Sequence, residues 1–148
     1  MSFNYNNLKF ELHCNYSYVP LKVGKLKVRI SEKLLEAILK NAQLMHPREI
    51  LFMLRGEKKK DYITISDIII PPFATYGHGF ATFSLGTLPI DFSIIGTVHS
   101  HPSGNLAPSI GDLNQAIGKI IMIVGYPYTK QNIAVYDREG NHVELEIG

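Results

Sequence analysis

Two histidines, a serine and an aspartate lie close together between His99 and Asp112, directly after an apolar stretch. His99 and His101 are one residue apart, so their side chains project to the same side of an extended strand. Both imidazoles can therefore bind one metal ion. Asp112 can supply a third ligand if the chain turns back into a helix near Ser109. Three protein ligands leave a coordination position for water, which distinguishes catalytic zinc sites from closed structural ones.

A strand and a loop must present the two imidazoles. Residues 94–98 lead into the first histidine and are mostly apolar, which predicts a strand. After His101, Pro102 favours extended backbone at the histidine, and Gly104 permits a turn. These residues shape the loop and are not expected to be ligands.

A short helix must present the carboxylate. Residues 109–117 carry apolar side chains at helical spacing, with Ser109 as the N-cap and Asp112 as the third helical residue, close to a capping box. Residues 120–124 are wholly apolar and predict a central strand that is buried on both faces.

Apolar periodicity also predicts the rest of the scaffold. A helix over 32–45, with Ser31 as its N-cap and Pro47 as its end, has an apolar face that needs a sheet to cover. The aromatic, glycine-containing segment 73–84 is expected to be a mobile loop or an exposed strand. The remaining strands are expected over 23–30, in an antiparallel hairpin of 49–55 and 62–70 with its turn at 56–61, and in a closing hairpin of 133–136 and 142–147.

Composition restricts the classes of protein to consider. The 148 residues suit one domain, and 45% hydrophobic with 19% charged residues is typical of a globular protein without a membrane span. The single cysteine, Cys14, excludes an internal disulfide and multi-cysteine zinc sites. A net charge of +2 is too small to indicate nucleic-acid binding, and the lysines at 58–60 are expected in a solvated turn. The N-terminal residues lack a secretory pattern, so we expect a cytoplasmic protein with no membrane partner.

The spacing of the four residues resembles a family signature. His99-x-His101, seven residues, Ser109, two residues, Asp112 is similar, in register at every defining position, to the signature of the JAMM (MPN-plus, JAB1) zinc metalloproteases. The order of the expected elements also matches, so the resemblance covers roughly residues 25–147.

A second element lies upstream. In that family a glutamate opens a Glu-x-x-Gly-x-Leu-x-Gly stretch on the strand after the first helix, and residues 49–56 correspond to it here. Phe52 stands where the family usually has glycine. A ring needs space that a hydrogen does not, which bears on the packing behind Glu49.

The resemblance implies a fold and a domain. It implies an α/β domain with a curved, mixed and mostly antiparallel central sheet flanked by helices, the three-layer JAB1/MPN architecture that is similar to cytidine deaminases. A single JAMM/MPN-plus domain would span residues 1–148, with its core at about 25–147.

The resemblance also implies a mechanism. One Zn²⁺ per chain would be held by His99, His101 and Asp112. Glu49 would act on the metal-activated water as general base and then as general acid toward the leaving amine. Ser109 would donate a hydrogen bond to the tetrahedral oxyanion. The competing role of Ser109 is helix capping, and that of Asp112 is an ordinary acidic residue in the first helical turn.

Members of the family cleave bonds after the C-terminal diglycine of ubiquitin, ubiquitin-like modifiers and bacterial sulfur-carrier proteins. We therefore expect an isopeptidase or peptidase whose substrate is a ubiquitin-like protein or its conjugate. Residues 73–84 could supply a sheet edge for the substrate tail, with Tyr76, His78 and Phe80 in contact with it. The chain has no long insertions, which favours a small modifier, an activating protein partner or a homodimer.

Two alternatives remain open. On ligand type alone, two histidines and one carboxylate also describe the facial triad of non-haem iron enzymes, although the spacing and Glu49 favour zinc hydrolysis. The other alternative is a non-catalytic MPN-type scaffold that binds a partner. Relatives of that kind generally lack the metal ligands, which are intact here.

Overall fold

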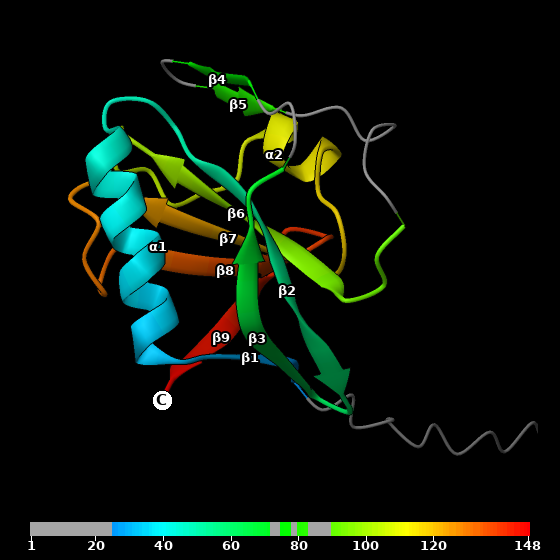
Figure 1. Cartoon of the computed structure of the whole chain (residues 1–148). Coiled ribbons are helices and arrows are strands. Elements are labelled where there is room, and N and C mark those ends of the chain that lie inside the picture. The colour runs from blue at the N-terminus through cyan, green and yellow to red at the C-terminus, as the bar shows by residue number, and fades with distance from the viewer. Residues whose placement is uncertain (1–24, 72–74, 78–79, 83–89) are drawn as a thin grey trace, which may run out of the picture.

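Nine strands and two helices are defined in the computed structural model, which describes residues 25–71, 75–77, 80–82 and 90–148, with side chains in 25–71 and 90–148 (Figure 1). The elements are β1 (Lys27–Ile30), α1 (Glu32–Met45), β2 (Leu51–Lys59), β3 (Tyr62–Ile69), β4 (Thr75–Gly77), β5 (Phe80–Thr82), β6 (Ile94–His101), α2 (Ile110–Asn114), β7 (Ile120–Gly125), β8 (Ile133–Asp137) and β9 (His142–Ile147).

Seven of these strands form one sheet that closes on itself, in the order β1-β3-β2-β6-β7-β8-β9. It closes because β1 pairs in parallel with both β3 and β9. β6 is parallel to β7, and the other four neighbouring pairs are antiparallel. The predicted mixed sheet is thus confirmed. The expected three-layer arrangement of a curved sheet did not include closure, whereas in the structure the sheet curves into a barrel whose first and last strands meet (Figure 1).

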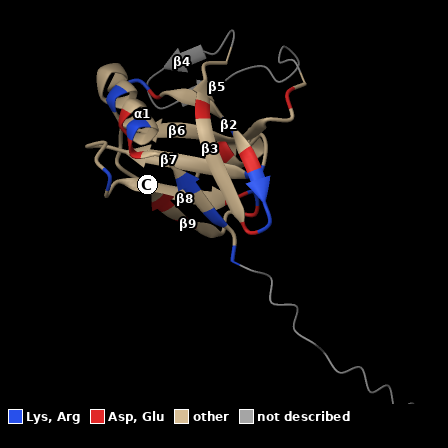
Figure 2. Cartoon of the chain, turned by 60° about the horizontal axis from the view of Figure 1, so that its bottom comes forward, with Lys and Arg blue, Asp and Glu red and all other residues tan. Residues whose placement is uncertain are grey.

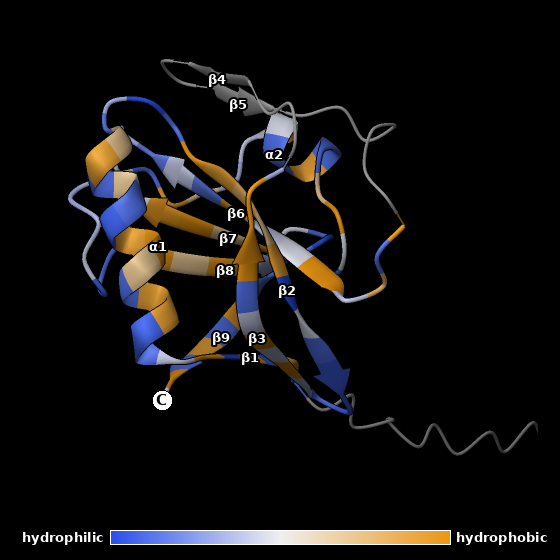
Figure 3. Cartoon of the chain, viewed as in Figure 1, coloured by the Kyte–Doolittle hydropathy of each residue, from blue (hydrophilic) through white to orange (hydrophobic). Residues whose placement is uncertain are grey.

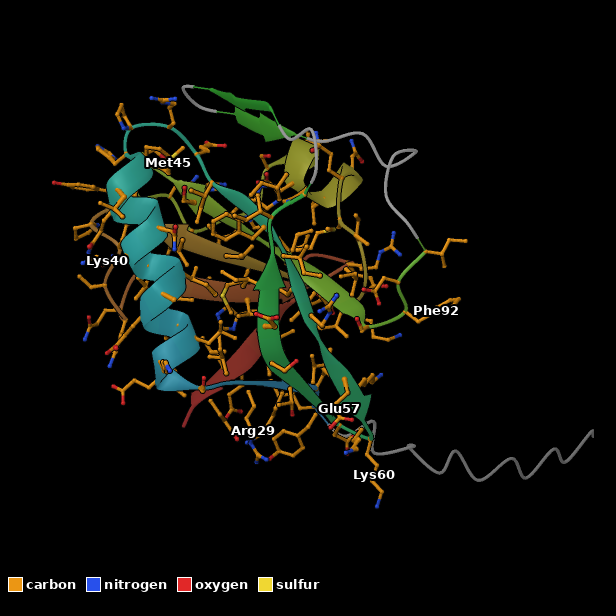
Figure 4. All side chains as sticks on the ribbon, viewed as in Figure 1. Arg29, Lys40, Met45, Glu57, Lys60 and Phe92 are labelled. Atoms are coloured by element: carbon orange, nitrogen blue, oxygen red, sulfur yellow. The ribbon has the colours of Figure 1, made fainter. Side chains whose placement is uncertain are left out.

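Ionic contacts line the seam where β1 meets β9. The Lys27 Nζ lies 3.0 Å from a carboxylate oxygen of Glu144 and 3.0 Å from one of Glu146, while Arg29 Nε lies 2.9 Å from the other Glu146 oxygen. The Arg29 guanidinium also lies 4.2 Å from the centroid of the Tyr62 ring on β3. Figure 4 places Arg29 at this end of the barrel. Such exposed pairs add little stability in water, but they match the register of the three strands.

The central strands β2, β6 and β7 have two different faces. Phe52, Val98 and Met122 are aligned in register and belong to the buried core that α1 covers. Because side chains alternate along a strand, His99 and its neighbour Ile123 point to the opposite face, toward α2. Figure 3 shows the difference along the chain: β7 is hydrophobic throughout, whereas the end of β6 is hydrophilic.

Helix α1 forms where the sequence predicts it. The Ser31 hydroxyl accepts the N–H of Leu34 at 3.3 Å and caps the first turn. Four apolar side chains on one face of the helix are buried against the sheet, and burial of each leucine or isoleucine contributes about 1.5–3 kcal/mol. They are Leu35, Ile38, Leu39 and Ala42. The helix ends before Pro47, as expected, because proline cannot donate the next hydrogen bond.

The β2–β3 hairpin is longer than predicted. The turn was expected over 56–61, but β2 continues to Lys59 and residues 60–61 connect the strands. The register shifts at Gly56, and a Cβ there would lie 2.0 Å from the carbonyl oxygen of Thr64. This glycine allows a close approach of two strands at a bulge rather than a turn.

The tip of this hairpin carries the lysines at 58–60, which are exposed as expected. The Lys59 Nζ lies 2.8 Å from a carboxylate oxygen of Glu57. Figure 2 shows basic and acidic residues side by side at this end of β2, and Figure 4 labels Glu57 and Lys60 there. The charges of the hairpin therefore partly compensate one another.

Strands β4 and β5 form a separate two-stranded antiparallel sheet. It lies beyond α2 at the same end of the molecule (Figure 1). A loop or an exposed strand was predicted over 73–84, and strands are found at 75–77 and 80–82; exposure stays a prediction. In the part of the chain that the structure describes, no helix has the length and hydropathy needed to span a bilayer.

Helix α2 is shorter than the predicted 109–117, and the segment that follows it lies in close contact with β6. Gly118 turns the chain with a φ of +76°. A Cβ on Gly118 would lie 2.4 Å from the carbonyl carbon of Ile95 and 2.6 Å from the nitrogen of Gly96. Only glycine permits both this φ and this approach, so Gly118 determines how closely the segment after α2 approaches β6.

We predict that Gly118→Ala lowers the free energy of unfolding by about 1–3 kcal/mol, because the positive φ becomes strained and the new methyl group meets backbone. Gly111→Ala is the matched control, since its Cβ would contact only the Ser109 hydroxyl oxygen at 3.4 Å. Urea unfolding of both variants measures the difference. Equal stabilities would contradict this role of Gly118.

Candidate metal centre

The first turn of α2 lies over the end of β6 and brings a carboxylate to both imidazoles. The His99 Nδ1 lies 3.4 Å from Asp112 Oδ1, and the His101 Nε2 lies 3.3 Å from Asp112 Oδ2. All three side chains are largely buried, with exposed fractions of 2% for His99 and 11% for both His101 and Asp112. The structure therefore brings together the three residues that the sequence nominates as ligands.

These distances fit a shared metal ion. Two ligand atoms that each lie 2.0–2.2 Å from zinc at a tetrahedral angle are about 3.3–3.6 Å apart. The two contacts of Asp112 involve different oxygens, so a common ion requires a small rotation of the side chains. Accordingly, within residues 25–71 and 90–148 no three His, Cys, Asp or Glu side chains already have the geometry of a formed metal site.

The side chain of His99 is neutral and its ring nitrogens are unpartnered among the described residues, as a metal ligand requires. Neither ring nitrogen has a hydrogen-bond partner among the described residues, although both are buried. Burial lowers the pKa of His99 to about 4, against the opposing effect of Asp112. The imidazole is therefore neutral at pH 7, which is the protonation state that binds metals.

Asp112 is ionised despite its burial. Burial raises its pKa, but the hydrogen bonds from His101 and from the backbone N–H of Ser109 outweigh that effect, and the pKa falls well below its usual range. A buried carboxylate held in its charged form is a suitable metal ligand.

His101 is oriented by the backbone of its own loop. Its Nδ1 lies 2.7 Å from the carbonyl oxygen of Asn105, and a carbonyl can only accept, so Nδ1 carries the hydrogen and Nε2 faces Asp112. Burial lowers the pKa of His101, but the hydrogen bonds to Asp112 and Asn105 raise it by more. The backbone carbonyl of Asn105 thus determines that His101 can bind a metal ion through Nε2.

Two glycines allow this loop to close. Gly104 has a φ of +78°, as its predicted turn requires. At the end of β7, a Cβ on Gly125 would lie 2.8 Å from a side-chain carbon of Leu106 and 3.0 Å from the carbonyl oxygen of Gly104. The loop that orients His101 therefore packs directly on β7.

Ser109 and Asp112 form the predicted capping box. The Ser109 hydroxyl accepts the N–H of Asp112 at 3.1 Å, and the Asp112 carboxylate accepts the N–H of Ser109 at 2.7 Å. Accepting an N–H engages a lone pair of the hydroxyl oxygen and leaves its hydrogen available to donate. Capping and donation to an oxyanion are therefore compatible, and Ser109 is exposed enough to meet a ligand.

Glu49 lies on the same face as the histidines. Leu51 is paired with His99, and Glu49, two residues before Leu51, faces the same way. Its side chain is partly exposed. Burial raises the pKa of Glu49, the charge of His101 lowers it and that of Asp112 raises it further, with a net rise. The carboxyl group therefore shares the electrostatic environment of the site and is poised to exchange a proton.

Ser100, between the two histidines, has a role that the sequence did not reveal. Its hydroxyl accepts the N–H of Ile50 at 2.8 Å, and its own N–H donates to the Ile50 carbonyl at 3.1 Å. These two bonds hold the residue after Glu49 against β6. The only sequence signal is a small polar residue inside an apolar strand.

Phe52 does not lie behind Glu49. It is buried in the core on the α1 side, in register with Val98. The phenylalanine at the position of the family glycine therefore packs in the hydrophobic core, on the opposite face of the sheet from His99.

For the other residues that the sequence analysis singled out, the structure describes either the backbone alone or nothing, with the exception of His46. Tyr76 and Phe80 lie in β4 and β5, where only the backbone is described. His78 and Cys14 lie outside the described residues. His46, which had no expected site role, contacts the Tyr128 hydroxyl through Nδ1 at 3.0 Å.

The sequence and fold identify the family of the chain. Residues 31–138 match the family described as prokaryotic homologs of the JAB domain, so the chain belongs to that family. A relative from Haloferax volcanii, described as a probable metalloprotease, is 31% identical over 127 residues, covering 81% of this chain and 79% of the relative. The family predicted from the motif is confirmed.

Solved structures with related sequences share the fold. A JAB1/MPN domain protein from Archaeoglobus fulgidus is 38% identical with a TM-score of 0.59, covering 80% of this chain and 97% of that chain. A structure described as a JAMM metalloprotease-like zinc site in the proteasome and signalosome is 34% identical with a TM-score of 0.60, covering 84% and 98%. A Desulfitobacterium hafniense protein with 18% identity and a TM-score of 0.54, covering 82% and 92%, supports the fold alone.

We predict that Ser100→Ala lowers the free energy of unfolding by about 1–3 kcal/mol, because the N–H of Ile50 is left buried without its acceptor. Ser66→Ala is the matched control. Its hydroxyl donates at 3.3 Å to the carbonyl of Arg55 in an exposed position, so its loss should change stability little. Thermal unfolding compares the two. A Ser100 variant as stable as the Ser66 variant would remove Ser100 from the support of the site.

Proposed function

We propose that the protein is a zinc-dependent peptidase that hydrolyses the bond after the C-terminal diglycine of a ubiquitin-like modifier or sulfur-carrier protein. One observation carries the proposal. Two buried imidazoles on β6 each have a ring nitrogen within 3.4 Å of the Asp112 carboxylate, on the face that also carries Glu49. The Haloferax relative described as a probable metalloprotease supports it.

The donor set suits zinc. His99, His101 and Asp112 would hold one ion, and nitrogen and carboxylate ligands with a fourth position free are typical of catalytic zinc sites. When bound, zinc supplies Lewis-acid activation of water and of the scissile carbonyl. The facial triad of iron enzymes shares these ligand types, and metal analysis of the purified protein distinguishes the two.

Glu49 and Ser109 would perform the remaining chemistry. The Glu49 carboxylate takes a proton from the attacking water and later delivers it to the leaving amine, and its raised pKa favours this exchange at neutral pH. The Ser109 hydroxyl donates its hydrogen to the oxyanion while its lone pair caps α2.

The substrate tail would lie along the small β4–β5 sheet. Its edges can accept an added strand, and it lies at the end of the molecule that carries α2 (Figure 1). Tyr76, His78 and Phe80 come from this segment and would contact the tail. An activating protein partner or a second copy of the chain could complete this surface.

The decisive experiment incubates the metal-loaded protein with linear fusions of ubiquitin-like proteins ending in diglycine, with and without a chelator. We expect cleavage after the diglycine that the chelator abolishes and zinc restores. Stoichiometric zinc without cleavage of any fusion would contradict the peptidase. A protein that purifies without metal and binds a partner would instead be a scaffold.

Substitutions separate the proposed roles. Glu49→Gln should retain zinc and lose hydrolysis by on the order of a hundredfold or more, because it removes the proton acceptor. Asp112→Ala or His101→Ala should lose zinc and hydrolysis together. Metal content by mass spectrometry and fusion cleavage measure both properties. Retained zinc and full activity in the Asp112 variant would refute its assignment as a ligand.

The edge of the β4–β5 sheet is tested by kinetics. Tyr76→Ala and Phe80→Ala should raise KM for a protein conjugate, because they remove contact area from the substrate tail. Cleavage of a short diglycine peptide at saturation should change little. Unchanged KM for the conjugate in both variants would remove this segment from the substrate path.

A further inference from the structure

Thr97 has a buried hydroxyl without a partner. It lies on β6 two residues before His99 and therefore on the same face. Its side chain is fully buried, and its hydroxyl oxygen has no hydrogen bond within the described residues. The cross-strand neighbours of Thr97 are Met53 and Ile121, both apolar. Among the described residues, the neighbouring strands therefore supply no polar side chain directly opposite Thr97, and the segment that follows α2 is the place to look for one.

Gln115, the C-cap residue of α2, offers a polar group. Its side-chain oxygen is also buried without a partner among the described residues. Asp112, one helical turn earlier, contacts His99, while Gly118, three residues later, packs on the backbone of Ile95 and Gly96. The chain thus runs back along β6, and Gln115 lies midway in sequence between these two contacts, as Thr97 lies between Gly96 and His99 on the face that carries His99.

His99 supplies the third group of this buried set. Both of its ring nitrogens lack a hydrogen-bond partner among the described residues. A neutral imidazole that binds a metal through one nitrogen carries a hydrogen on the other, and metal-binding histidines almost always donate that hydrogen to an acceptor. For His101 this acceptor is the Asn105 carbonyl. His99 has no such acceptor among the described residues.

We propose that Thr97 and Gln115 are positioning residues for His99. The Thr97 oxygen accepts the ring N–H of His99, and the Thr97 O–H donates to the Gln115 side-chain oxygen, directly or through one bridging water. The two donors, the His99 N–H and the Thr97 O–H, are then paired with the two acceptors, the oxygens of Thr97 and Gln115. The chain fixes the tautomer of His99 and turns its free nitrogen toward the ion. This inference rests on the metal centre of the proposed function, not on its substrate.

Zinc affinity tests the proposal. Thr97→Val preserves shape but removes the hydroxyl, and we expect zinc affinity, measured by competition with a chromophoric chelator, to fall about 10- to 100-fold. Thr97→Ser should restore affinity close to that of the unsubstituted protein. Thr64→Val, an exposed threonine on β3, is the matched control and should leave affinity unchanged.

A merely structural role gives a different result. Replacing an unpartnered buried hydroxyl by a methyl group should not lower the melting temperature of the metal-free protein. In zinc-loaded protein labelled with ¹⁵N-histidine, the non-coordinating His99 N–H should be protected from exchange, and Thr97→Val or Gln115→Met should remove that protection. The effects of these two substitutions on affinity should be less than additive, because they interrupt one chain.

Three outcomes would overturn the inference. The first is unchanged zinc affinity in both Thr97→Val and Gln115→Met. The second is a loss of metal-free stability in Thr97→Val that accounts for the loss of affinity. The third is the absence of zinc binding by the unsubstituted protein, which would also remove the metal centre. Zinc binding without cleavage of any fusion would refute only the peptidase.

Discussion

One buried carboxylate, that of Asp112, holds the site together. It accepts the N–H of Ser109 and so closes the first turn of α2, and it contacts the imidazoles of His99 and His101. A charge removed from water must be compensated by such partners. Since the same carboxylate caps the helix and meets the histidines, moving α2 away from β6 would keep the cap but leave this charge without its imidazole partners.

The central position of β6 explains how a polar site exists inside an apolar sheet. β6 is paired on one side with β2 and on the other with β7, so its backbone groups are satisfied along its length. Val98 then serves the core under α1, while His99 on the opposite face serves the site. Alternation of side chains along one strand supplies both functions.

Local signals made much of this predictable. The bounds of α1 follow from Ser31, Pro47 and the apolar spacing between them, and the capping box of Ser109 and Asp112 follows from residues three apart. The histidines and Asp112 could be expected to meet because only a short loop separates them. The catalytic role expected of Glu49 came from the resemblance to a family. Each of these features depends on residues that are near in sequence or that belong to a specific motif.

Features that depend on distant neighbours could not be predicted. The barrel closure depends on a four-residue strand, Lys27–Ile30, whose two partners are remote in sequence. Gly56 was predicted to begin a turn, because no residue near it in sequence indicates that the backbone of Thr64 approaches it closely. Ser100 and Phe52 are ordinary residue types, and their roles became visible only once the strand register defined which groups they meet.

The closing seam of the barrel has a consequence for how the protein folds. Lys27 and Glu144 are 117 positions apart, whereas Ile50 and Ser100 are separated by 50, and the ligand residues lie within one short stretch. Joining remote segments requires the largest loss of chain entropy and is slow in proteins rich in non-local contacts. The β6–α2 unit can thus become ordered while the first and last strands are still apart, and pairing at the seam completes the molecule.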